Sequence, residues 1–289
     1  MLERWARPLR GFFGGAASFV DATYRVLGAP GRLLQDLLNG AWLGHSLHAV
    51  LVDVVVGGST AALLLDILRV VFGIDGLETA TTWVLGLSTL SALGAILSGL
   101  TDYKDTAPDS SERDIAGLHG VVNIVATVGF LASFLLRLAD SHDAGFWVLL
   151  VSYLVVSVGA YIGGHVVFKY GYMVNHNAFS DIEQAADFTA VLPVASLPEA
   201  TPTKAMLGET ALVLVRRGDV VHALHEVCSH AGGPLAEGEL KGDTIICPWH
   251  FSTFRLQDGA VVHGPAGTRQ EAYRARIRGD QVEVQGPRA

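Results

Sequence analysis

Cys228-Ser229-His230 and Cys247-Pro248-Trp249-His250 are the two stretches of this sequence that decide how its C-terminal third folds. The patterns C-x-H and C-x-x-H bring two thiols and two imidazoles onto two short loops that can face each other. Such a ligand set fits either a tetrahedral Zn²⁺ site or a [2Fe–2S] cluster with cysteine on one iron and histidine on the other. The four residues therefore predict a metal centre of one of these two kinds.

The residues around these ligands favour the cluster. The first loop continues as Ala231-Gly232-Gly233-Pro234-Leu235, the second as Phe251-Ser252-Thr253-Phe254, and a third turn, Gly264-Pro265-Ala266-Gly267, follows. Between residues 189 and 286, these three stretches resemble the two cluster-binding loops and the proline loop of Rieske iron–sulfur proteins. The resemblance implies a small antiparallel β domain that holds a [2Fe–2S] cluster at one tip.

The same resemblance assigns roles to individual residues. It implies that Cys228 and Cys247 bind the inner iron as thiolates. It also implies that His230 and His250 bind the outer, redox-active iron near the surface. Ser252 is expected to hydrogen-bond cluster sulfur. The apolar residues expected to shield the cluster and tune its potential are Pro234, Leu235, Trp249 and Pro265.

Several positions depart from the high-potential Rieske proteins of respiratory complexes. Those proteins carry an extra cysteine in each loop, where this chain has Gly233 and Trp249, and both of its cysteines are proposed ligands, so no disulfide is expected. Phe254 stands at the position of a tyrosine and lacks its hydroxyl, whereas Ser252 keeps the other donor. Phe251 replaces a usual glycine. We therefore expect a low, ferredoxin-like potential within the Rieske range of about −150 to +300 mV.

Composition points to a membrane protein for the rest of the chain. Half of the residues are hydrophobic, only 17% are charged, and the mean hydropathy is +0.39. Four apolar stretches, at about 47–71, 82–100, 115–136 and 146–168, are each long enough to cross the roughly 30 Å hydrocarbon core of a bilayer. The predicted fold class is thus a membrane α-helical bundle of four transmembrane helices plus a small all-β Rieske domain. The net charge of −8 gives no reason to expect nucleic-acid binding.

The distribution of charge suggests a domain layout and a topology. Residues 1–44 mix five arginines with large apolar residues and show no signal-peptide pattern, so they are predicted to form an amphipathic segment. This segment either lies on a membrane face or packs on its own protein. Residues 45–176 are the expected membrane domain, 177–188 a linker and 189–289 the Rieske domain. Basic residues mark both termini as cytoplasmic in a multi-pass protein of the plasma membrane.

The apolar spans contain ionisable residues, which are costly in lipid and are therefore functional candidates. His45 and His48 begin the first span, His119 lies early in the third and His165 late in the fourth, all toward one side of the membrane. Three interpretations remain open. Two of the histidines bind haem b as axial ligands, or histidine with Asp53 or Asp102 forms a quinone or metal site, or the histidines only link helices.

The membrane part has its own family likeness. It rests on the stretch 42–48 (WLGHSLH), on Asp66, on 117–123 (GLHGVVN), on Gly163-Gly164-His165 and on Val174-Asn175. These residues resemble an uncharacterised bacterial four-helix membrane domain that often precedes a Rieske module. Ser46 and Ala49 stand where that family commonly has proline. The resemblance implies architecture and a membrane redox setting.

Together these observations predict a membrane-anchored one-electron carrier, more an electron-transfer protein than a complete enzyme. Its expected partners are the lipid bilayer and either a redox protein or a quinone, with a relay through a haem or quinone site in the bundle. Two alternatives are the ferredoxin component of a separate Rieske oxygenase and a non-enzymatic redox sensor. A sensor would show no sustained turnover with any acceptor.

Overall fold

The computed structural model describes residues 2–178 and 185–287. The chain forms two compact units, each described by itself below. The helical unit consists of Met1–Leu38 with Ser46–Gly171, and the β unit consists of Asn39–His45 with Tyr172–Ala289. The expected linker at 177–188 lies partly outside the described residues.

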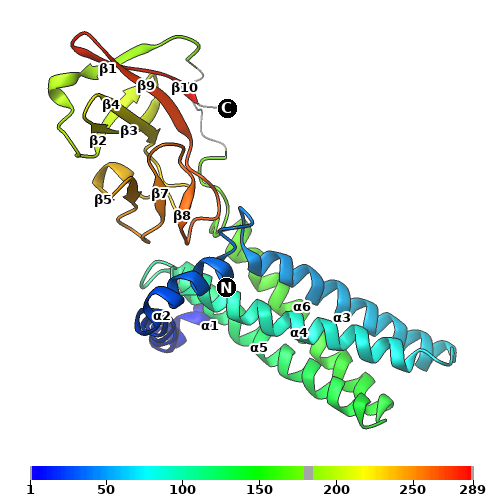
Figure 1. The fold of residues 1–289 in the computed structure, drawn as a ribbon. Helices are drawn as coiled ribbons and strands as arrows, with labels where there is room; N and C mark the ends of the chain where they lie inside the picture. The colour runs from blue at the N-terminus through cyan, green and yellow to red at the C-terminus, as the bar shows by residue number, and fades with distance from the viewer. Residues whose placement is uncertain (1, 179–184, 288–289) are drawn as a thin grey trace. The chain divides into compact units, whose positions relative to one another are not determined.

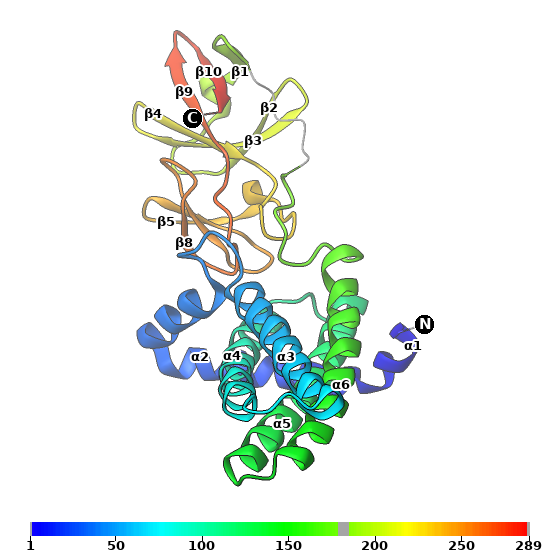
Figure 2. The same ribbon diagram turned by 90° about the vertical axis from the view of Figure 1, so that its right-hand side faces the viewer.

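The core of the helical unit is a bundle of four long helices, α3 to α6, that run side by side (Figures 1 and 2). Their bounds are Leu47–Phe72 for α3, Glu78–Tyr103 for α4, Ser111–Leu138 for α5 and His142–Phe168 for α6. All four are long and apolar enough to cross a membrane. Each predicted span lies inside one of these helices, so the four-helix prediction is confirmed.

Local sequence explains where these helices begin and end. The side chain of Ser110 accepts a hydrogen bond from the backbone N–H of Arg113 at 3.0 Å and thereby caps the start of α5. Gly73 ends α3 with a φ of 66°, a conformation that glycine adopts without steric cost. The helices then pack closely through small residues. A Cβ on Gly58 of α3, for example, would lie 3.0 Å from Ser88 of α4.

One ion pair is fully buried in the bundle. Both side chains of Asp66 in α3 and Arg137 in α5 are inaccessible to solvent, and Arg137 donates from both terminal nitrogens to the two oxygens of Asp66. Arg69 lies farther from Asp66, at 3.8 Å, and bonds Asp143 at 2.9 Å. The principal partner of Asp66 therefore comes from another helix, and not from the next turn of its own.

The N-terminal segment packs on the helical unit and also exposes large apolar side chains. It forms a short helix α1 (Leu2–Ala6), a 3₁₀ turn η1 (Arg7–Leu9) and helix α2 (Arg10–Asn39), which is broken at Gly28. α2 packs on its own unit: Phe13 is buried, and Arg10 bonds Asp114 of α5 at 2.6 Å. Large apolar residues of the same segment are exposed, namely Trp5, Phe12, Phe19, Val26 and Leu33.

The β unit contains two antiparallel sheets. The larger has the order β1-β10-β9-β4-β3-β2, and the smaller has the order β5-β6-β7-β8 (Figure 2). The strands are β1 (Thr189–Pro193), β2 (Thr203–Leu207), β3 (Thr210–Arg217), β4 (Val220–His225), β5 (Glu239–Lys241), β6 (Thr244–Ile246), β7 (Thr253–Arg255), β8 (Val261–His263), β9 (Ala272–Arg278) and β10 (Gln281–Pro287).

Alternating side chains build the core of this unit. In β10, Val282 and Val284 are buried while their neighbours are only partly covered, as expected for a strand with one face inward. A second apolar cluster, which includes both cysteines, Leu235 and Phe254, lies under the loops. The all-β prediction is confirmed. The short strands β2, β5, β7 and β8 were not predicted from the sequence, because a few residues carry too weak an alternating pattern.

Candidate iron–sulfur site

The first candidate loop follows β4 and precedes the 3₁₀ turn η3 (Leu235–Glu237). The N–H of Cys228 donates to the carbonyl oxygen of Gly233 at 2.8 Å, and the N–H of Gly232 donates back to the carbonyl oxygen of Cys228 at 2.9 Å. Gly232 has a φ of +79°, which is why glycine suits this position. The backbone thus wraps around Cys228 in one tight turn.

The second loop, between β6 and β7, repeats this geometry. The N–H of Cys247 donates to the carbonyl oxygen of Ser252 at 2.9 Å, and the N–H of Phe251 donates to that of Cys247 at 3.1 Å. Phe251 has a φ of +64°. The loop therefore keeps the left-handed conformation without glycine, and the side chain of Phe251 is 66% exposed, so it makes few contacts that would repay the strain.

The two loops bring the four predicted ligands together in pairs. Cys228 and Cys247 are each 1% exposed and belong to one buried apolar cluster. The neighbouring Cys247 side chain and burial raise the pKa of Cys228, whereas the neighbouring Cys228 side chain lowers the pKa of Cys247. The imidazoles of His230 and His250 lie with ring centres 5.0 Å apart.

This pairing suits a binuclear cluster better than a single ion. Within residues 2–178 and 185–287, no group of three or more His, Cys, Asp or Glu side chains converges on one ion position. A tetrahedral zinc site needs four ligands at one point, whereas a [2Fe–2S] cluster needs two thiolates at one iron and two imidazoles at the other. The donor chemistry of the residues present therefore fits the cluster.

The proline loop is held against the second ligand loop by Ser252. This residue is fully buried, and its Oγ accepts a hydrogen bond from the backbone N–H of Ala266 at 3.1 Å. Because the oxygen acts as acceptor there, its own hydrogen is free to be donated elsewhere. Pro265, which follows a cis peptide bond, and Leu235 are buried beside the ligand loops.

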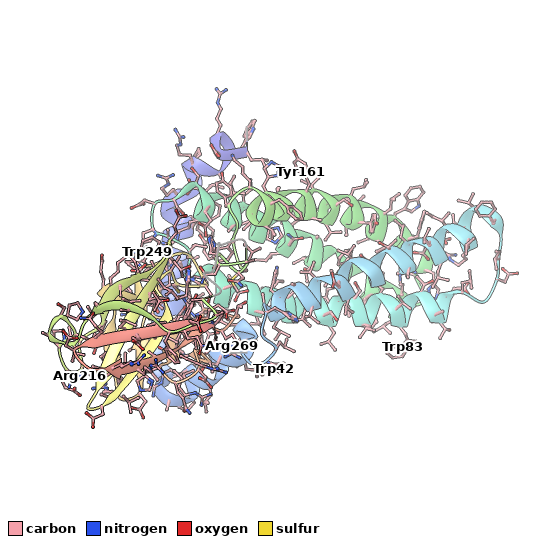
Figure 3. The ribbon with its side chains drawn as sticks, turned by 90° about the horizontal axis from the view of Figure 1, so that it is seen from above. Trp42, Trp83, Tyr161, Arg216, Trp249 and Arg269 are labelled. Atoms are coloured by element: carbon pink, nitrogen blue, oxygen red, sulfur yellow. The ribbon has the colours of Figure 1, made fainter. Side chains whose placement is uncertain are left out.

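The other two residues expected to shield the cluster are less buried. Pro234 is partly buried, whereas Trp249 is 54% exposed and is labelled in Figure 3. Gly233 has no room for a side chain, because an added Cβ would lie 2.7 Å from the sulfur of Cys247 and 3.1 Å from the Trp249 ring. Trp249 therefore covers Gly233 with one edge and leaves the rest of its indole accessible.

Gln270 holds the first ligand loop and was not identified from the sequence. Its amide is fully buried and donates to the carbonyl oxygens of His225 (2.8 Å) and Val227, while its oxygen accepts from the N–H of Ser229 at 3.0 Å. A single glutamine after the proline loop carries no periodicity or spacing signal. Only the folded arrangement of segments distant in sequence reveals its role.

A second unpredicted support comes from the segment that follows α6, within the β unit. The N–H of His176 donates to the carbonyl oxygen of Ser229 at 3.0 Å, and the Asn177 amide donates to that of Val227 at 2.8 Å. The ring of Tyr172 lies edge-on to that of His230, with centres 6.2 Å apart. The cluster loop is thus contacted by residues that the sequence assigned to the membrane domain and linker.

The membrane histidines are only partly brought together. His48 of α3 and His119 of α5 lie with ring centres 6.1 Å apart. His165 lies against Tyr161 of its own helix, with ring centres 4.9 Å apart, and Asp53 is exposed. His45 belongs to the β unit, where its backbone approaches Gly267. Tyr161 and Trp83 both point outward from the bundle (Figure 3).

Comparison with known proteins agrees with this description. Residues 187–274 match the model of the Rieske [2Fe–2S] domain, and residues 44–176 match that of a "Predicted membrane protein (DUF2231)". The anthranilate 1,2-dioxygenase ferredoxin subunit of Burkholderia cepacia is 30% identical over 95 residues, which are 32% of this chain and 88% of that protein. Ferredoxin CarAc of Metapseudomonas resinovorans is 30% identical over 80 residues, which are 28% and 75% of the two chains.

One solved structure is similar to part of this chain. The ferredoxin of carbazole 1,9a-dioxygenase from Nocardioides aromaticivorans IC177 is 28% identical, with a TM-score of 0.33, over 34% of this chain and 97% of that one.

The fold and the paired thiols and imidazoles define an iron–sulfur protein of the electron-transfer class. The chain belongs to the Rieske [2Fe–2S] family through its C-terminal domain, which binds a [2Fe–2S] cluster, and its N-terminal region is a DUF2231 membrane domain.

Proposed function

We propose that this chain is a membrane-anchored one-electron carrier. Cys228 and Cys247 hold the inner iron of the cluster as thiolates, and His230 and His250 hold the outer iron as neutral imidazoles. The observation that carries this assignment is the segregation of the four donors into two cysteines in one buried cluster and an imidazole pair. The outer iron accepts the electron, since imidazole is neutral and removes less positive charge than thiolate.

Three features of the residues around the cluster support this proposal. The Ser252 hydroxyl donates to cluster sulfur, because its oxygen already accepts from Ala266. Leu235 and Pro265 exclude water from the buried side. With no disulfide and with Phe254 in place of a hydroxyl donor, the potential lies low in the Rieske range of about −150 to +300 mV.

The anchor is the four-helix bundle, helped by the N-terminal helices. The apolar side chains exposed on α1 and α2, including Trp5 and Phe19, insert into the interface of the plasma membrane while the arginines contact lipid headgroups. Both termini then lie in the cytoplasm. Retention of the protein in the membrane pellet after alkaline carbonate extraction tests the anchor, and release into the supernatant would contradict it.

The partner of the cluster is a redox protein that docks at the exposed rings of Trp249 and Phe251, next to His250. The relatives named as ferredoxins of dioxygenases support delivery of electrons to a separate oxygenase component. A membrane quinone is the other donor or acceptor compatible with a lipid-embedded bundle. A redox sensor remains the non-enzymatic alternative.

One experiment distinguishes a carrier from a sensor. The full-length protein, purified in detergent, is reduced stoichiometrically and mixed in a stopped-flow instrument with an oxidised Rieske oxygenase component or a soluble quinone. A carrier is reoxidised rapidly and turns over many times when a reductant is supplied. A single slow oxidation with no turnover for any acceptor would favour the sensor.

A further inference from the structure

The helical unit contains a pair of histidines whose arrangement is built for metal ligation. We propose that His48 and His119 are the two axial ligands of one haem b, an inference that rests on the proposed electron-transfer function and names its membrane centre. The two residues lie on different helices, α3 and α5, and their ring centres are 6.1 Å apart with an angle of 79° between the planes. They approach each other although 70 residues of sequence separate the segments that carry them.

Each imidazole is fixed by a backbone carbonyl. The Nδ1 atom of His48 lies 2.8 Å from the carbonyl oxygen of Ala95, and that of His119 lies 2.9 Å from the carbonyl oxygen of Gly159. The Asn123 amide nitrogen also lies 3.1 Å from Nδ1 and 3.5 Å from Nε2 of His119, and it donates to the carbonyl oxygen of His119 at 2.8 Å. Because the carbonyl oxygens of Ala95 and Gly159 only accept, bonds to them place the hydrogen on Nδ1 of each ring and leave Nε2 its lone pair in the neutral form. Metal-bound histidines show this pattern, in which the second nitrogen donates to a carbonyl and fixes the ring orientation.

Glycines on the neighbouring helices make room for both rings. A Cβ on Gly99 of α4 would lie 2.9 Å from Nδ1 of His48, and one on Gly163 of α6 would lie 2.7 Å from Cε1 of His119. Any larger residue would displace the imidazole from its carbonyl partner. The two histidines and the two glycines therefore form one packed arrangement that all four bundle helices share.

The number of ligands selects haem over a bare ion. In the described part of the chain, no third His, Cys, Asp or Glu completes a metal site at this pair. Zinc or copper needs three or four protein ligands, whereas haem iron takes only two, because the porphyrin supplies the rest. Two imidazoles on opposite sides of one metal, with bonds of about 2.0–2.1 Å, place their ring centres about 6 Å apart. A quinone carbonyl fits less well, since both N–H groups are already donated to the backbone.

Visible spectroscopy of the full-length protein tests this site. The protein is expressed with 5-aminolevulinate, purified in detergent and measured before and after dithionite reduction, and haem is quantified as its pyridine complex. We expect a Soret band that sharpens and shifts to the red on reduction, with about one haem per [2Fe–2S] cluster. The absence of a Soret band in protein that carries its cluster would overturn the haem site while leaving the proposed carrier function intact.

Substitutions of single histidines test which of them bind the haem iron. H119A should lose the low-spin haem spectrum, whereas H165A, at the histidine whose ring lies against Tyr161 of its own helix, should keep it. H48M keeps a residue that can bind iron and should raise the haem potential, since a Met/His pair has a higher potential than two histidines. The cluster EPR signal should be unchanged in all three. An unaltered haem potential in H48M, or loss of haem in H165A but not in H119A, would refute the assignment.

Discussion

Replacing Ser252 with alanine should lower the potential of the cluster. The Ser252 hydroxyl is fully buried, accepts from the N–H of Ala266 at 3.1 Å, and keeps its hydrogen for the cluster. A hydrogen bond of this kind is worth about 1–1.5 kcal/mol net and favours the reduced, more negative cluster. Since a tenfold change in a one-electron equilibrium corresponds to about 59 mV, S252A should lower the potential by about 40–65 mV.

The assay is a redox titration of the full-length protein followed by EPR of the reduced cluster. The matched control is T253V, because the neighbouring hydroxyl of Thr253 is spent on the carbonyl oxygen of Phe251 at 3.1 Å. T253V should leave the potential unchanged. Equal potentials in wild type and S252A, with the cluster fully retained, would show that Ser252 serves only to hold the proline loop.

Three further outcomes follow from the same contacts. F254Y should raise the potential by about 40–65 mV in the same titration, because it adds a hydroxyl donor beside the cluster loop, and an unchanged or lowered potential would refute this. Q270A should shorten the half-life of the cluster absorbance on heating, because the N–H of Ser229 and the carbonyl oxygen of His225 lose their bonds to Gln270, at about 1–3 kcal/mol for each buried group; an unchanged half-life would contradict this role. D66N should destabilise the helical unit by about 3–5 kcal/mol in thermal unfolding followed by circular dichroism, since it leaves Arg137 buried without an anion, whereas R137M should cost less because Arg69 remains 3.8 Å from Asp66. Equal losses of stability in D66N and R137M would argue against the expected difference between them.

Local sequence was sufficient for the parts of the fold that depend on neighbouring residues. Each predicted apolar span lies in one helix. The length of a hydrophobic stretch is enough to identify a segment that can cross a bilayer. The spacing of cysteine and histidine predicted two facing loops; in the structure the two cysteines share one buried cluster and the two imidazole ring centres lie 5.0 Å apart, and their ligation of iron stays a prediction. At Phe251, which replaces a usual glycine, the N–H donates to the carbonyl oxygen of Cys247 and the backbone takes the left-handed conformation.

The contacts that sequence reasoning missed are long-range. Gln270 and Asn177 each reach the first ligand loop from a distant part of the chain, and neither shows a periodic pattern. Asp66 and Arg69 lie one turn apart on α3, but Arg137 from another helix binds both carboxylate oxygens of Asp66. Helical spacing identifies partners only within one helix, and packing between helices decides the rest.

The membrane histidines show the same limit. The sequence placed His45, His48, His119 and His165 at one depth and could not say which of them meet. The structure pairs His48 with His119 because Gly99 and Gly163 admit their rings between the helices. Since glycine is common in membrane helices for packing reasons, its role beside an imidazole becomes visible only once the helices are arranged.

The central claim is that two cysteines and two histidines bind a one-electron [2Fe–2S] cluster. Pulsed EPR of the dithionite-reduced, detergent-purified protein tests it most directly, combined with metal analysis of the same sample. We predict a reduced cluster signal with strong couplings to two histidine nitrogens, and non-haem iron and acid-labile sulfide at about two each per chain. A sample that contains about one zinc per chain, no iron and no EPR signal would contradict the account.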